Sequence, residues 1–138
     1  MHAFAKVLVV EDEALVRACY LRILVGSQCQ VREVDNGLDA LQLMQQQPFD
    51  VVLLDQSMPD MDGMAVLQSI KALWPETEVI MITGYPELES AKQAVRLGAY
   101  DYLAKPVGPD EVIFAANGAM THKRWRLHQD PGAATCVQ

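Results

Sequence analysis

The chain has 138 residues, of which 11 are basic and 18 acidic, for a formal net charge of −7, and 51% of its residues are hydrophobic. This length and apolar content suit one globular domain with its own core and exclude an intrinsically disordered chain. The acidic excess argues against general binding to nucleic acid or to an anionic membrane surface, since both carry negative charge. Apolar runs such as Val51–Leu54 are too short to span a bilayer, and the N-terminus lacks the layout of a signal peptide.

The three cysteines, Cys19, Cys29 and Cys136, are odd in number and far apart. Their spacing forms neither a CxxC pair nor a His/Cys cluster, so it favours neither a structural zinc site nor a disulfide framework. Cys19 lies at helical spacing from Val16 and Ile23, which predicts a small buried hydrophobe on one helix face. The thiols fit the reducing cytoplasm.

Short apolar runs alternate along the chain with longer segments of helical period, which predicts alternating strands and helices. In chain order, the expected elements are a strand over Lys6–Val10, a helix over Glu13–Val25, a strand over Val31–Val34, a helix over Leu38–Gln47, a strand over Asp50–Leu54, a helix over Met64–Leu73, a strand over Glu78–Ile82, a helix over Glu87–Leu97, a strand over Tyr100–Ala104 and a last helix from about Pro109.

These elements make five strand–helix units, (βα)₅, whose connections are too short for anything but parallel crossovers. Right-handed crossovers then predict an α/β fold with a doubly wound, parallel five-stranded sheet. In such sheets, chemistry gathers at the carboxyl ends of the strands.

Polar side chains follow four of the five predicted strands. Glu11 and Asp12 follow the first strand, Asp55 the third, Thr83 the fourth and Lys105 the fifth. An acid such as Asp12 is common as a helix cap, but Asp55 follows four apolar residues and precedes no immediate helix. The positions therefore predict a site at the carboxyl edge of the sheet.

Carboxylates gathered in this way repel one another. Two of them ~4 Å apart, at an effective dielectric constant near 20, cost about 4 kcal/mol. Either one carboxyl group is protonated or a cation occupies the site, and oxygen ligands without His or Cys favour Mg²⁺ over zinc. With Lys105 as a second positive charge and Thr83 as a hydrogen-bonding group, the site suits phosphoryl transfer onto a carboxylate.

Four motifs, in order and spacing, resemble the response-regulator receiver domain of two-component signalling, in particular the receivers of nitrogen-regulatory-type activators. They are VLVVEDE with Glu11 and Asp12, LLDQSMPDMDG with Asp55, Met58, Pro59 and Gly63, VIMITGY with Thr83, and GAYDYLAKP with Tyr102, Lys105 and Pro106. The resemblance covers residues 5–122. It implies the flavodoxin-like strand order 2-1-3-4-5, a receiver domain over residues 1–122, and a helix extension with a disordered tail over residues 123–138.

The resemblance also implies a role for each residue of the site. Asp55 would accept a phosphoryl group from the phosphohistidine of a sensor histidine kinase or a phosphotransfer protein. Asp12 and Asp55 would bind Mg²⁺ together with the main-chain carbonyl of Ser57, and Glu11 would hold a metal-bound water. Lys105 would pair with the acyl phosphate, and the bond between Lys105 and Pro106 is expected to be cis.

The resemblance further implies that Thr83 and Tyr102 form a switch. Phosphate would draw in the Thr83 hydroxyl, the Tyr102 ring would turn inward, and the face of the fourth helix, fifth strand and fifth helix would change shape. Ser57 and Tyr85 lie two residues after Asp55 and Thr83, where the family tunes the lifetime of the acyl phosphate. The bulk of Tyr85 predicts slow loss of the phosphoryl group. The resemblance also implies that the chain is not an enzyme, apart from catalysing its own phosphorylation and dephosphorylation.

The C-terminal segment His122–His128 reads HKRWRLH. It is either a docking patch for an acidic partner or nucleic acid, or a cationic last turn that suits the helix dipole and leads into a linker, and we favour the second interpretation. Trp125 either anchors a contact or packs back on the domain. Asn117-Gly118 predicts a weak or kinked point in the last helix.

No output domain fits after the receiver, so the response would pass to a downstream protein or to an output domain outside this chain. A second copy of the chain, bound through the face of the fourth helix, fifth strand and fifth helix, is an alternative partner, and the sequence does not fix the oligomeric state.

Two other functions on a similar fold fit the residues less well. An aspartate-nucleophile phosphatase would carry DxDxT or DxDxV, whereas Asp55-Gln56-Ser57-Met58 lacks the second acid. A flavin-binding protein would need a phosphate-binding loop after the first strand, where Glu11-Asp12-Glu13 would repel phosphate.

Overall fold

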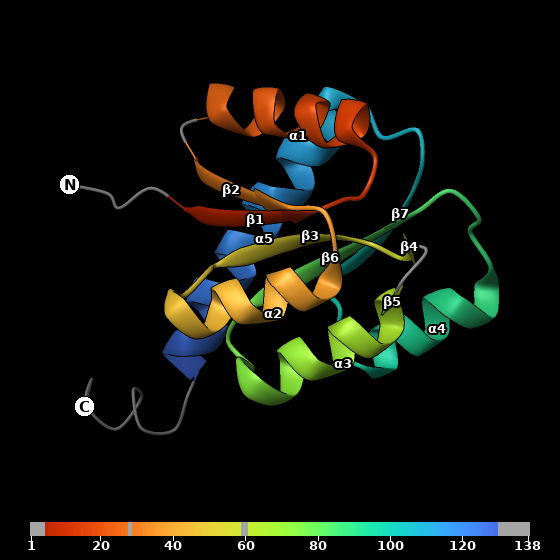
Figure 1. The fold of residues 1–138 in the computed structure, drawn as a ribbon. Helices are drawn as coiled ribbons and strands as arrows, with labels where there is room; N and C mark the ends of the chain where they lie inside the picture. Colours follow the sequence, from red (N-terminus) through yellow and green to blue (C-terminus); the bar gives the residue numbers. More distant parts are fainter. Residues whose placement is uncertain (1–4, 28, 59–60, 130–138) are drawn as a thin grey trace.

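The centre of the fold is a parallel sheet of five strands in the order β2-β1-β3-β6-β7 (Figure 1). The computed structural model describes residues 5–27, 29–58 and 61–129. The strands of this sheet are β1 (Lys6–Val10), β2 (Gln30–Val34), β3 (Val51–Asp55), β6 (Glu78–Thr83) and β7 (Asp101–Ala104). Numbered within the sheet, this is the order 2-1-3-4-5, so the predicted (βα)₅ fold is confirmed.

Helices cover both faces of the sheet (Figure 1). One face carries α1 (Ala14–Gly26) and α5 (Pro109–Gln129). The other carries α2 (Gly37–Gln46), α3 (Gly63–Leu73) and α4 (Leu88–Arg96). In the described ranges, no helix has both the length and the apolar content that crossing a bilayer requires.

Successive strand residues alternate between two core layers. Leu54 and Met81 point to the layer under α2, α3 and α4, whereas Leu53 and Ile80 point to the layer under α1 and α5. All five residues of β3 are buried. Burial on both faces explains why the central strands read as continuous apolar runs rather than as alternating ones.

The predicted boundaries differ from the observed ones by about one residue, and one element was missed. A two-stranded antiparallel hairpin, β4 (Ser57–Met58) and β5 (Met61–Asp62), links β3 to α3. Gly63 then begins α3 where a Cβ atom would lie 2.6 Å from the Cα of Gln56, so the close approach of the two backbones requires glycine.

The prediction that Cys19 is buried was wrong. Cys19 is exposed, and α1 buries Tyr20 and Leu24 instead, one turn apart on the helix. Val16 and Ile23 are half-buried at the margin of this stripe. Larger side chains remove more apolar area from water, so α1 is rotated to face the sheet with the Tyr20–Leu24 stripe and leaves the small thiol outside.

Helix α5 is one helix from Pro109 to Gln129 and continues through the predicted weak point. A Cβ atom at Gly118 would lie 2.5 Å from the hydroxyl oxygen of Tyr100, so this glycine makes room for the tyrosine that precedes β7. The predicted disordered tail lies outside the described residues from position 130 onward, as do Cys136 and Pro59.

Candidate functional site

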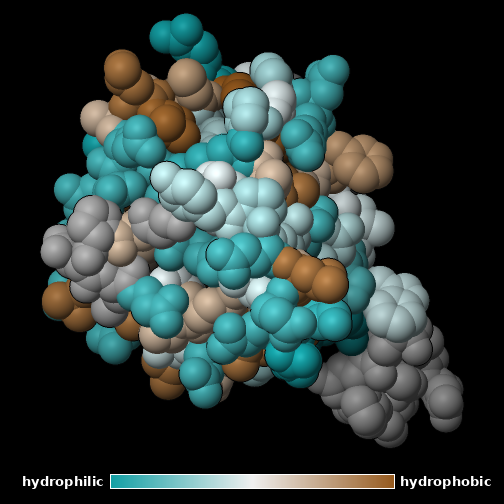
Figure 2. All heavy atoms as spheres, turned by 90° about the vertical axis from the view of Figure 1, so that its right-hand side faces the viewer, coloured by the Kyte–Doolittle hydropathy of each residue, from teal (hydrophilic) through white to brown (hydrophobic). Residues whose placement is uncertain are grey.

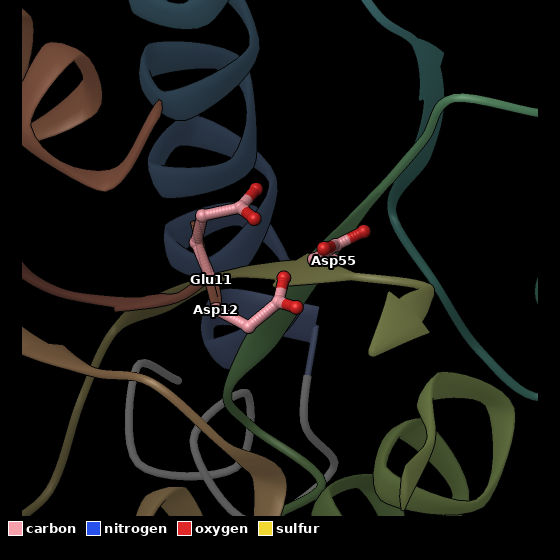
Figure 3. Close-up of side chains that lie close together, drawn as sticks. All are labelled: Glu11, Asp12 and Asp55. Atoms are coloured by element: carbon pink, nitrogen blue, oxygen red, sulfur yellow. The ribbon is translucent and has the colours of Figure 1, made fainter. Parts of the chain in front are cut away.

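The predicted site residues meet at the carboxyl ends of β1, β3, β6 and β7. Glu11 and Asp12 follow β1, and Asp55 ends β3. Figure 3 shows the carboxylates of these three residues close together, and one oxygen atom of each lies within 4.8 Å of one from each of the others. The face toward which the strands of Figure 1 run is largely hydrophilic, with scattered hydrophobic side chains (Figure 2).

Lys105 is the cation among these acids. Its Nζ lies 3.0 Å from Oε1 of Glu11, 3.5 Å from Oδ2 of Asp55 and 3.9 Å from Oε1 of Glu13. Its main-chain N–H donates to the carbonyl of Thr83 at 2.7 Å, and the peptide bond to Pro106 is cis, as the resemblance implied. Burial opposes the charge, but the contact with Glu11 and the charge of Asp55 outweigh it and raise the pKa of Lys105. Lys105 is therefore charged at neutral pH.

Glu11 is almost fully buried, with only 1% of its surface exposed. Its Oε2 accepts a hydrogen bond from the N–H of Glu13 at 3.1 Å. Its Oε1 is near the Lys105 ammonium but has no partner in hydrogen-bonding geometry. Burial raises the pKa of Glu11 from 4.5 to about 7, although these two neighbours act in the opposite direction. Glu11 thus offers an oxygen atom with unused acceptor capacity next to the other carboxylates.

This donor set fits a hard divalent cation. It consists of carboxylate oxygens, and one lysine does not neutralise three carboxylates. Mg²⁺ prefers such oxygen ligands, whereas zinc sites usually contain His or Cys. Glu11, Asp12 and Asp55 can therefore hold a metal ion. The role of the Ser57 main-chain carbonyl as a ligand of this metal site stays a prediction.

Thr83 and Tyr85 lie together at the end of β6. Thr83 is buried, and its Oγ1 accepts a hydrogen bond from the N–H of Tyr85 at 3.0 Å. The Tyr85 side chain is 78% exposed, so its ring projects from the surface. Any shielding of the site by this ring requires it to move.

Tyr102, on β7, contacts a residue that sequence analysis did not single out. Its hydroxyl donates to Oε1 of Gln56 at 2.8 Å, and its ring packs against the core layer under α2, α3 and α4. Gln56 follows Asp55 directly, and this position at the end of a buried strand was the signal that could have identified it.

The basic C-terminal segment lies away from this site, at the amino end of the sheet. Nη1 of Arg126 is 2.8 Å from Oε1 of Glu78, and Nδ1 of His122 contacts Oε2 of the same carboxylate. Nζ of Lys123 is 2.6 Å from Oδ1 of Asp50. Three of its basic side chains are thus paired with acids of the same domain.

Trp125 contacts a neighbour on its own helix, α5. Its ring stacks on that of His122, with 6.1 Å between the ring centroids, while 56% of its surface stays exposed.

The strand order, together with three carboxylates and a lysine at the carboxyl edge of the sheet, defines a receiver-type signalling domain. The family model of the response regulator receiver domain matches residues 7–117. The chain belongs to this family, and the predicted resemblance is confirmed.

Sequence relatives agree with this assignment. The DNA-binding transcriptional regulator NtrC of Escherichia coli (strain K12) is 36% identical over 114 residues, which cover 83% of this chain and 24% of NtrC. The regulatory protein LuxO of Vibrio vulnificus (strain YJ016) is 34% identical, over 91% of this chain and 27% of LuxO. The chain therefore spans about a quarter of the length of the curated relatives it matches.

Solved structures agree as well. NtrX from Brucella abortus has a TM-score of 0.84 and 32% sequence identity, over 90% of this chain and 28% of NtrX. A CheY-like receiver domain protein from Methanospirillum hungatei JF-1 has a TM-score of 0.86 and 25% identity, over 90% of this chain and 99% of that one. Membership of the family places the chain in two-component phosphorelay signalling, as a phosphoacceptor switch. The family assignment is therefore favoured over the phosphatase and flavin-binding alternatives.

Proposed function

We propose that Asp55 is the phosphoacceptor and takes its phosphoryl group from the phosphohistidine of a sensor histidine kinase or a phosphotransfer protein. The observation that carries this proposal is the position of Asp55, which ends a fully buried strand beside Glu11 and Asp12 with Lys105 3.5 Å away. An acid held beside two others and a lysine is suited to accept a negatively charged group only when positive charge balances the site.

Asp55 and Lys105 have different roles in the proposed phosphoryl transfer. A carboxylate oxygen of Asp55 bonds to phosphorus while the phosphorus–nitrogen bond of the donor breaks and the imidazole leaves with the electron pair. Lys105 keeps its charge and balances the phosphoryl oxygens. Asp12, Asp55 and the main-chain carbonyl of Ser57 would hold Mg²⁺, with Glu11 holding a water beside it, and the bound ion would supply the remaining positive charge. Transfer then depends on positioning and charge rather than on further covalent chemistry.

Thr83 and Tyr102 carry the switch in this proposal. The Thr83 hydroxyl accepts a hydrogen bond from Tyr85, which leaves its own proton free to be donated to a phosphoryl oxygen. A shift of Thr83 toward Asp55 then changes the packing beside Tyr102 on β7 and the face of α4, β7 and α5.

That face offers apolar side chains to a partner. Leu88 and Val95 on α4 and Phe114 on α5 are 69%, 67% and 81% exposed. Exposed apolar side chains are candidates for burial against a partner. These exposed side chains support the proposal that, after phosphorylation, this face binds a downstream protein, an output domain of the same polypeptide, or a second copy of this chain.

The proposal includes the extent and location of the domain. The receiver would occupy residues 1–122 with the remaining residues as its extension, which is consistent with a family match ending at residue 117. A place in the reducing cytoplasm is supported by the free thiols of Cys19 and Cys29. The net charge of −7 supports the absence of direct nucleic-acid binding by this domain.

The test is phosphorylation with acetyl phosphate in the presence and absence of Mg²⁺, followed by intact mass. We expect one added phosphoryl group that requires Mg²⁺ and is lost in Asp55→Asn. Asp62→Asn is the matched control, because Asp62 caps α3 from the hairpin after Asp55 and asparagine caps a helix equally well. No mass gain in the wild type, or an unchanged gain in Asp55→Asn, contradicts the proposal.

A further inference from the structure

A side-chain hydrogen bond joins the loop that follows Asp55 to the aromatic residue of β7. The Tyr102 hydroxyl donates to Oε1 of Gln56 at 2.8 Å, across 46 positions of sequence. Gln56 is covalently bonded to Asp55, so this contact links the residue next to the proposed phosphoacceptor with the proposed switch residue.

The bond requires the Tyr102 ring to reach across β6. In the sheet, β6 lies between β3, which Gln56 follows, and β7, which carries Tyr102. Tyr102 pairs in register with Met81, and its half-buried ring packs on the core layer that contains Leu54, Met81 and Ala94. The ring is therefore turned inward, over the sheet.

Gln56 presents its side chain from a fixed point. Its N–H donates to the carbonyl of Ile82 at 2.9 Å, and its carbonyl accepts from the N–H of Gly63 at 3.3 Å. A Cβ atom at position 63 would lie 2.6 Å from the Gln56 Cα, so the start of α3 and the Gln56 backbone approach each other closely. The backbone from which the Gln56 side chain extends is thus bonded to both β6 and the first residue of α3.

Thr83 is engaged elsewhere in the same structure. Its Oγ1 accepts from the N–H of Tyr85 at 3.0 Å. The Thr83 hydroxyl is thus bonded to the segment that follows β6, whereas the Tyr102 hydroxyl is bonded to the loop that follows β3.

We propose that Gln56 is a positioning residue that holds the Tyr102 ring inward, across β6. The inference rests on the proposed function, because it assigns Gln56 to the switch that phosphorylation of Asp55 would operate. It means that the ring position is set in part by the phosphoacceptor loop itself. A net hydrogen bond of ordinary strength changes the ratio of inward to outward rings about five-fold.

The experiment removes the acceptor and the donor separately and together. Gln56→Met keeps an unbranched side chain of similar length without the amide, and Tyr102→Phe keeps the ring without the hydroxyl. NMR of ¹³C-labelled aromatic rings in the unphosphorylated full chain reports the ring position through contacts with the Met81 methyl group. Gln68→Met, on the exposed face of α3, is the matched control for the Gln-to-Met change.

We expect Gln56→Met and Tyr102→Phe each to lower the inward-to-outward ratio about five-fold, and the double variant to lower it no further. Gln68→Met should leave the ratio unchanged. Apparent affinity for fluoroberyllate with Mg²⁺ should weaken by up to the same factor in Gln56→Met, because the competent conformer is then less populated.

A ring position unchanged in Gln56→Met, or additive effects in the double variant, overturns the proposal. Phosphorylation by acetyl phosphate distinguishes this failure from failure of the proposed function. If the wild type gains no phosphoryl group, the assignment of Asp55 fails, whereas the ring ratio in the unphosphorylated chain still decides the role of Gln56.

Discussion

Replacing Glu78 should detach the C-terminal end of α5 from the sheet. Glu78 begins β6 with 1% of its surface exposed. Its carboxylate is shared by Arg126 at 2.8 Å, by His122 and by Lys71 at 3.5 Å. One buried acid therefore connects α5, the end of α3 and the central sheet, and its removal leaves the cationic groups facing one another.

The size of the effect follows from how deeply each partner is buried. Removing one member of a buried ion pair costs about 3–5 kcal/mol, because the remaining charge is left without compensation. Arg126 and His122 are 37% and 42% exposed, so water will screen part of this loss. Lys71 keeps its hydrogen bonds to the carbonyls of Pro75 and Thr77. We therefore expect Glu78→Ala to lower the free energy of unfolding by about 3 kcal/mol, and Glu78→Gln by about 2 kcal/mol.

Urea unfolding measures the loss, and hydrogen exchange shows where it acts. Amides of α5 from Gly118 onward should lose more protection than those of β1. Glu33→Gln is the matched control, since Glu33 is 45% exposed and pairs with Arg17 at 3.0 Å. An exposed pair of this kind is worth less than about 1 kcal/mol. If Glu78→Ala cost no more than this control, or if α5 kept its protection, the ion cluster would not be what holds the helix end.

Three further predictions concern the carboxyl edge of the sheet. Because burial raises the pKa of Glu11 to about 7, the folded metal-free chain binds more protons than the unfolded chain above pH 4.5. Its free energy of unfolding, relative to Glu11→Gln, should then fall by about 3 kcal/mol from roughly pH 4 to pH 8. Urea unfolding at stepped pH checks this, Mg²⁺ should reduce the fall, and a flat or rising difference would refute it. Gly63→Ala should lower the free energy of unfolding by about 2 kcal/mol through the clash with Gln56, whereas Gly84→Ala, with no atom within 4 Å of its Cβ, should be neutral or slightly stabilising in thermal denaturation. Equal midpoints would speak against the clash. Tyr85→Ala should shorten the half-life of the acyl phosphate, but only modestly since the ring is exposed, and an unchanged half-life would rule out shielding.

The acidic site was predictable because chain connectivity alone positions it. Glu11, Asp55 and Lys105 each come at or directly after the end of an apolar strand, and parallel strands place their carboxyl ends at one edge. Identifying the strands therefore located the side chains. The apolar runs were long enough to identify, since burial on both faces removes the polar residues that would interrupt them.

Contacts between distant segments were not predictable in this way. The bond from Tyr102 to Gln56 and the pairing of Arg126 with Glu78 each join residues more than forty positions apart. A polar residue at the start of a strand, such as Glu78, looks solvent-exposed in sequence, and only the return of α5 along the sheet shows that it is covered. Cys19 was misplaced for a related reason, because the rotation of a helix about its axis depends on which neighbour it packs against.

The acids at the two ends of the sheet differ in how far basic side chains balance their charge. At the amino end, Glu78 and Asp50 have their own cations from α3 and α5, so that end is balanced by the chain itself. At the carboxyl end, three carboxylates share one lysine and the pKa of Glu11 is raised. An imbalance of this kind destabilises the fold, and any cation that binds the folded form recovers part of the loss by mass action. Phosphorylation would add further negative charge at the same place. The Mg²⁺ proposed to support phosphoryl transfer should therefore also stabilise the fold, and both effects should weaken together when Asp12 is replaced by Asn.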